Sequence, residues 1–153
     1  MTLLSGKALV PKRFFKGGAP KLRSSGFDLT IGKIFDLEGK EVVGPFVLKP
    51  GHMVQVVSAE AFNLGNDVTG HVTYKTGLTR RGIWALTVGI VDPGWKLPIA
   101  TTLLNFSRND YPVQLGQLFL RVSFFEHVPV KVEESDSPAS LVEYHRDIQS
   151  LAS

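Results

Sequence analysis

The chain has 153 residues, of which 43% are hydrophobic and 20% are charged, and its net charge is +3. This is the size and composition of one globular domain, so we expect one hydrophobic core. Its apolar stretches are shorter than the roughly 20 residues of a membrane-spanning helix. The absence of cysteine excludes disulfides, thiolate metal sites and cysteine nucleophiles. Because the first residues also lack the pattern of a secretory signal, we expect a soluble, cytoplasmic protein without a membrane partner.

Six basic residues precede the first acidic residue, Asp28. A phosphate-bearing partner and a solvated basic surface both account for this imbalance, and the solvated surface is the simpler interpretation. Only Phe14 and Phe15 offer rings for base stacking in this segment, and no nucleic-acid reader motif is present. We therefore expect no nucleic-acid partner.

Most of the chain is predicted to form β-strands. From Phe27 to Val130, short β-branched and aromatic runs alternate with turns rich in Gly, Pro, Asn and Asp, which is typical of an antiparallel sandwich or barrel. The predicted strands are Phe27–Phe35, Glu41–Leu48, Met53–Phe62, Thr69–Lys75, Ala85–Val91, Ile99–Asn105 and Gln117–Glu126.

The end of the chain follows a different pattern. Ser137 and Pro138 form a helix start signal, and apolar residues then recur near helical spacing as far as Leu151. An acidic linker, Glu133–Asp136, precedes this predicted short helix. We therefore divide the chain into a β domain over 1–132, which includes a basic N-terminal segment over 1–25, and a linker with a C-terminal helix over 133–153.

Five segments carry a resemblance to a known family. In chain order they are Arg23–Gly32, Leu48–Gly51 with Glu60 and Leu64, Lys75–Ile83, Gly89–Trp95 with Asn105, and Leu115–Phe124. Together they resemble the dCTP deaminase and dUTPase superfamily over residues 23–125. The resemblance implies a distorted jelly roll, a β-barrel-like sandwich of the dUTPase type, assembled as a homotrimer with nucleotide sites between subunits.

The resemblance assigns a catalytic role to Asp92. This residue ends an apolar run just before a Pro-Gly turn, where partial burial would raise the pKa of a carboxylate toward that of a useful general base. Asp before Pro-Gly is also a common turn former that caps its own backbone. The residues alone favour the turn, whereas the resemblance favours the site. Trp95 either lines the base pocket or packs at its rim.

Five residues are expected to bind the substrate phosphates. Lys75 and Thr76 stand where the family generally has Arg and Ser, so a positive charge and a hydroxyl remain while the bidentate guanidinium is lost. Gly77 would let the backbone approach a phosphate, although a turn glycine explains it too. Arg80 matches a substrate-contacting arginine of the deaminases, and Arg121 stands where dUTPases usually have a phosphate-contacting glutamine.

A metal ion is implied on the phosphate side of the site. Asp28 matches an Asp that supports Mg²⁺ in dUTPases, and we expect its contact to pass through water. A surface carboxylate at a turn is the alternative interpretation.

Two departures from the family bear on function. Deaminases carry a proton-transferring glutamate ten residues beyond the Asp, and that position is Thr102 here. A hydroxyl cannot replace a carboxylate as general base. The chain also has no glycine after Gly116, so we expect the glycine-rich closing arm of many dUTPases to be absent and catalytic efficiency to be lower.

We therefore predict a pyrophosphatase of the dUTPase type, which converts dUTP or a related deoxynucleoside triphosphate to the monophosphate and pyrophosphate with Mg²⁺. The alternative is a catalytically degraded trimer that binds a nucleotide or serves a structural role. A dCTP deaminase ranks last, because it would need another carboxylate, for which Glu60 is the only family-matched candidate nearby.

Overall fold

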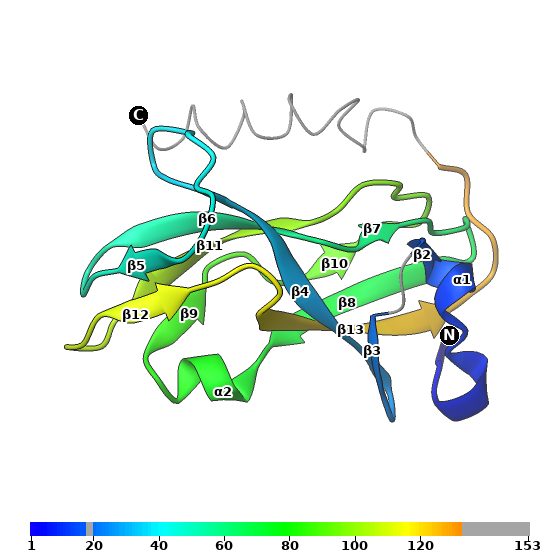
Figure 1. The fold of residues 1–153 in the computed structure, drawn as a ribbon. Coiled ribbons are helices and arrows are strands. Elements are labelled where there is room, and N and C mark those ends of the chain that lie inside the picture. Colours follow the sequence, from blue (N-terminus) through cyan, green and yellow to red (C-terminus); the bar gives the residue numbers. More distant parts are fainter. Residues whose placement is uncertain (18–19, 133–153) are drawn as a thin grey trace.

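Antiparallel strands dominate the structure, a computed structural model that describes residues 1–17 and 20–132. Figure 1 shows them as one curled sheet with short ribbons attached at its edges. The sheet runs in the order β10 (Ile90–Val91), β8 (Val68–Tyr74), β13 (Leu118–Glu126), β4 (Gly26–Phe35), β6 (Met53–Ser58), β11 (Ala100–Asn105) and β9 (Ile83–Ala85). The mostly β, antiparallel architecture expected from the sequence is confirmed.

Shorter elements complete the fold. Strands β1 (Thr2–Leu3) and β3 (Lys21–Arg23) pair with β13 and β4, while β12 (Tyr111–Val113) pairs with β5 (Phe46–Leu48) and β2 (Phe15–Lys16) with β7 (Ala61–Phe62). The helical elements of the described residues are the 3-10 turn η1 (Gly6–Ala8), α1 (Pro11–Phe14) and α2 (Thr76–Thr79). None of these described helices is long and apolar enough to cross a membrane.

Strand β4 curls the sheet because it changes partner along its length. Its first half pairs with β13 and its second half with β6, and the register with β6 shifts between Ile31 and Lys33. Gly32 lies at that shift, where a Cβ atom would stand 2.5 Å from the Cα of Ala59. Glycine thus permits the close approach that lets one strand serve both halves of the sheet.

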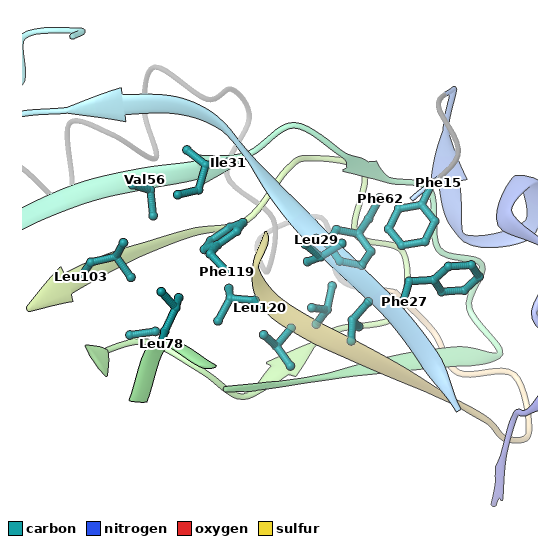
Figure 2. Packing of buried hydrophobic residues seen from close by; sticks show 14 of the residues in the cluster. Phe15, Phe27, Leu29, Ile31, Val56, Phe62, Leu78, Leu103, Phe119 and Leu120 are labelled. Atoms are coloured by element: carbon teal, nitrogen blue, oxygen red, sulfur yellow. The ribbon is translucent and has the colours of Figure 1, made fainter. Parts of the chain in front are cut away.

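The core fills the space enclosed by the curled sheet (Figure 2). At one end lies a group of buried aromatic rings, in which Phe14 and Phe124 stack with centroids 4.1 Å apart. Phe15 and Phe27 meet edge to face in the same group. Because Phe14 and Phe15 are buried, neither ring is available to stack on a nucleic-acid base.

Most of the longer strands were predicted from the sequence, whereas several short elements, including β1, β2 and β3, were not. Strand formation in 41–48 is limited to β5 and an isolated bridge at Glu41, and 85–91 contains the end of β9 and, after a loop, β10. Strand β12 was not predicted because it has three residues, one of them Pro112; a two-stranded ribbon tolerates that proline. Helix α2 is a single turn and gave no periodic signal. The predicted helix over 137–151 lies outside the described residues.

Candidate functional site

Three cations surround the carboxylate of Asp28. Oδ2 accepts hydrogen bonds from Arg23 Nε at 2.6 Å and Lys75 Nζ at 2.9 Å, and Oδ1 accepts one from Arg121 Nε at 3.2 Å. The Asp28 side chain has no exposed surface, whereas the two arginines are more than one third exposed. We call these four residues the Asp28 cluster.

Strand register brings the cluster together. Asp28 on β4 lies opposite Arg121 on β13, and Arg121 lies opposite Thr73 on β8. Lys75 follows β8 directly, two residues beyond Thr73, so its side chain lies on the same face of the sheet. Arg23 arrives from β3 through the tight β3–β4 turn at Ser24 and Ser25.

The electrostatics of the cluster favour an ionised Asp28. Burial alone would raise the pKa of this carboxyl, but the hydrogen bonds from Lys75, Arg23 and Arg121, with the Lys75 charge, outweigh burial and hold the pKa below its ordinary value of 3.8. Three positive charges against one negative charge leave an excess of two. Lys21, opposite Asp28 on β3 and exposed, adds a further positive charge nearby.

The geometry does not fit a metal ion bound to Asp28. Both carboxylate oxygens already accept hydrogen bonds from cations, and the side chain is fully buried. Within 1–17 and 20–132, no group of three His, Asp or Glu side chains is placed to hold a metal ion. A divalent cation at this position would also meet an excess of positive charge.

Helix α2 extends the basic surface from Lys75. A shallow depression beside it is lined by Lys75, Gly77, Leu78, Arg80, Arg81, Tyr111, Gln117 and Leu118. Thr76 is exposed on the same helical turn, and a Cβ at Gly77 would meet no atom within 4 Å. The structure thus gathers all five predicted phosphate-binding residues around the end of β8 and the adjoining part of β13.

Asp92 and Trp95 lie in a separate cavity of about 140 Å³. Its lining is Val72, Thr87, Val88, Gly89, Ile90, Val91, Asp92, Trp95, Ile99 and Ala100. Asp92 is exposed, and it is the one ionisable side chain among these lining residues. The cavity therefore offers apolar walls, an indole and a single carboxylate.

Asp92 does form a turn, as one interpretation of the sequence expected, but through its backbone alone. The N–H of Trp95 donates to the carbonyl oxygen of Asp92 at 3.2 Å, and Gly94 adopts the φ of +82° that the turn requires. In the described residues, the Asp92 carboxylate accepts no hydrogen bond from this turn. The turn therefore forms without using the carboxylate.

Asp92 and the Asp28 cluster are far apart within one chain, although Val72 of β8 also lines the cavity. Val91, beside Asp92, pairs with Gly70 on β8, and Lys75 comes five residues later along the same strand direction. At about 3.3 Å per residue, this places Lys75 roughly 16 Å along the strand from Gly70, the partner of the residue beside Asp92. A single chain does not bring Asp92 next to the cations.

Position 102 and Glu60 provide no proton-transferring carboxylate. Thr102 lies on β11 opposite Gln55 of β6, whose buried Oε1 atom has no hydrogen-bond partner among the described residues. Glu60 uses both carboxylate oxygens to accept from the Thr30 N–H, at 3.2 and 3.0 Å, and one of them also accepts from the Thr30 hydroxyl. Glu60 is thus engaged in holding β4.

Sequence reasoning did not assign a role to Arg23. The residue opens the first resembling segment, and its five-residue spacing from Asp28 across a Ser-Ser turn was the available signal. In the structure it makes the shortest contact with Asp28 that the cluster contains.

Comparison with known proteins agrees with this fold. A family model described as dCTP deaminase-like matches residues 32–142. The dCTP deaminase of Thermococcus gammatolerans is 30% identical over 107 residues, which cover 67% of this chain and 68% of that protein. The dUMP-forming dCTP deaminase of Methanopyrus kandleri is 34% identical over 104 residues, which cover 67% of this chain and 53% of that protein.

Solved structures give the same result for the fold. The dCTP deaminase of Agrobacterium tumefaciens superposes with a TM-score of 0.61 at 14% identity, over 88% of this chain and 48% of that one. The EIAV dUTPase superposes with a TM-score of 0.56 at 17% identity, over 78% and 95% of the two chains. The chain belongs to the dCTP deaminase-like family, whose fold it shares with the dUTPases.

Proposed function

We propose that this chain is a deoxynucleoside triphosphate pyrophosphatase of the dUTPase type. The observation that carries the proposal is the cavity in which Asp92 is the one ionisable lining residue and stands beside Trp95 and apolar walls. An apolar slot with an indole suits a nucleobase and sugar, and an exposed carboxylate at its mouth suits a base that accepts a proton from water.

The reaction needs few groups from the protein. A water molecule transfers a proton to Asp92, and its oxygen attacks the α-phosphorus. The bond from that phosphorus to the bridging oxygen breaks, and pyrophosphate leaves with the bonding electrons. Cations such as Lys75, Arg80 and Arg121 stabilise the negative charge that develops on the phosphates.

This chemistry requires more than one copy of the chain. A general base must lie within hydrogen-bond reach of the water it activates, and the separation of Asp92 from the Asp28 cluster is several times larger. We therefore propose a homotrimer in which the cavity of one subunit faces the cluster of the next.

Ring deamination is less well supported, although the relatives are named dCTP deaminases. That reaction requires a carboxylate to transfer protons at the base, and Thr102 and the engaged Glu60 do not provide one. Asp92 alone remains at the cavity.

A second candidate is a trimer that binds nucleotide without hydrolysing it. The internal pairing of Lys75 and Arg121 with Asp28 favours this alternative, because part of their charge is already neutralised. The two candidates differ in whether Asp92 carries out chemistry.

The deciding measurement is pyrophosphate release from a panel of deoxynucleoside triphosphates, with and without Mg²⁺. We expect the wild type to release pyrophosphate from dUTP or a related nucleotide, and Asp92→Asn to lose at least a hundredfold in rate, the scale of a general base. Glu38→Gln, which neutralises an exposed carboxylate in a turn, should leave the rate unchanged. Nucleotide binding without release would favour the second candidate, and ammonia release from dCTP would contradict the proposal.

A further inference from the structure

We infer that the Asp28 cluster binds the phosphates of the nucleotide through fixed cations, without a divalent metal ion at Asp28. The inference deepens the proposed function and rests on it only for the identity of the ligand. The contacts that Asp28 makes disagree with the family expectation of Mg²⁺ at this Asp.

First, both oxygens of the Asp28 carboxylate already accept hydrogen bonds from cations. A carboxylate that supports Mg²⁺ must offer an oxygen to the ion or to one of its waters. In this chain Oδ2 accepts from two cations and Oδ1 from a third, and no part of the side chain is exposed. An ion or its water would have to displace a charged donor.

Second, the net charge around Asp28 is positive. The cluster has two positive charges in excess, and Lys21 lies across the strand pair from Asp28. This field repels a divalent cation and attracts a polyphosphate.

Third, Arg23 and Arg121 have N–H donors that Asp28 does not use. Arg23 and Arg121 each contact Asp28 through Nε, although a guanidinium carries five N–H donors. Among the residues that the structure describes, their terminal nitrogens make no hydrogen bond. Both side chains are more than one third exposed, so Asp28 fixes each guanidinium while its terminal donors remain able to reach phosphate oxygens.

Arg121 is the residue by which this cluster differs from the usual dUTPase sequence. It occupies the position where dUTPases usually have a neutral glutamine, so its replacement by glutamine removes one fixed charge and restores the usual residue. Asp28 would keep Arg23 and Lys75 as partners, which preserves the local fold.

The experiment is calorimetric titration of the full-length chain with inorganic tripolyphosphate, first in EDTA and then with excess Mg²⁺. We expect the wild type to bind in EDTA and to bind no more tightly with Mg²⁺, because the metal neutralises the ligand. Arg121→Gln should bind at least about tenfold more weakly in EDTA, the effect of one lost charge-assisted hydrogen bond.

The control is Arg108→Gln, which removes the same charge from an exposed position in the loop between β11 and β12. It should bind like the wild type. If Arg121→Gln fails to fold by circular dichroism, Arg23→Gln takes its place with the same expectation. Wild-type binding only in the presence of Mg²⁺, or equal effects of the site and control substitutions, would overturn the inference.

These outcomes are separable from those of the proposed function. Metal-free binding without pyrophosphate release from any nucleotide would support the inference and contradict the pyrophosphatase. Release that requires Mg²⁺, together with Mg²⁺-dependent tripolyphosphate binding, would support the pyrophosphatase and contradict the inference.

Discussion

Asp28 is the buried anion with which the three cations of the candidate site are paired. Its removal would leave three cations facing one another without the anion that holds them. We expect Asp28→Asn to lower the free energy of unfolding by roughly 3 kcal/mol, as when one partner of a buried ion pair is removed. Urea unfolding near pH 7 measures this, and an effect no larger than that of Glu38→Gln would show that the cluster does not stabilise the fold.

The same carboxylate predicts a pH dependence. Hydrogen bonds hold the folded pKa of Asp28 below its unfolded value, so the unfolded chain takes up the proton more readily. The stabilising contribution is complete above the unfolded pKa of about 4 and is lost as the pH falls through the lower folded pKa. The stability difference between wild type and Asp28→Asn should therefore be constant from about pH 7 to pH 5 and shrink toward pH 3. A difference that grew in acid would contradict this assignment.

Individual site residues were predictable from family motifs, whereas their contacts were not. The resemblance selected Asp28, Lys75 and Arg121, but their pairing joins residues 47 and 93 positions apart in the chain. Such contacts depend on strand order, which short-range patterns do not contain. The sequence consequently suggested a metal-supporting or surface carboxylate, and the structure places Asp28 inside an ion-pair cluster.

At the scale of the elements, close packing of β4 against β13 depends on Gly26. A Cβ at this position would lie 2.1 Å from the carbonyl oxygen of Val122, so any side chain forces the two strands apart. We expect Gly26→Ala to destabilise the fold by roughly 3 kcal/mol or more, at the upper end of overpacking effects. Thermal unfolding should show little change for the matched control Gly77→Ala, whose added methyl meets no atom within 4 Å. Equal melting temperatures for the two variants would contradict the packing argument.

Most strands were predictable because their hydrophobic runs are bounded by turn residues, as in β4, β6 and β11. The elements that escaped prediction are the shortest ones. Strand β12 and helix α2 have three and four residues, and tertiary pairing rather than local periodicity determines them. Local sequence patterns likewise did not predict that β4 pairs with both β13 and β6.

At the scale of the whole molecule, the separation of Asp92 from the Asp28 cluster, together with the proposed homotrimer, predicts complementation between subunits. Asp92→Asn and Lys75→Ala should each be inactive alone. Trimers refolded from an equal mixture should regain about one quarter of the wild-type activity, because random assembly pairs an intact cavity with an intact cluster at that frequency. Pyrophosphate release from the mixture measures this recovery. No recovery, in mixtures shown by light scattering to be trimers, would mean that each subunit carries its own complete site.

The Asp28 carboxylate also has a consequence for turnover in the proposed reaction. A phosphate that binds the cluster competes with an anion that never leaves, so part of the attraction between the cations and the ligand is already offset. In the proposed pyrophosphatase, such competition would weaken ground-state binding of both substrate and pyrophosphate and would keep the guanidinium groups ordered between cycles. The cluster would thereby release its product quickly and be ready for the next nucleotide without rearrangement.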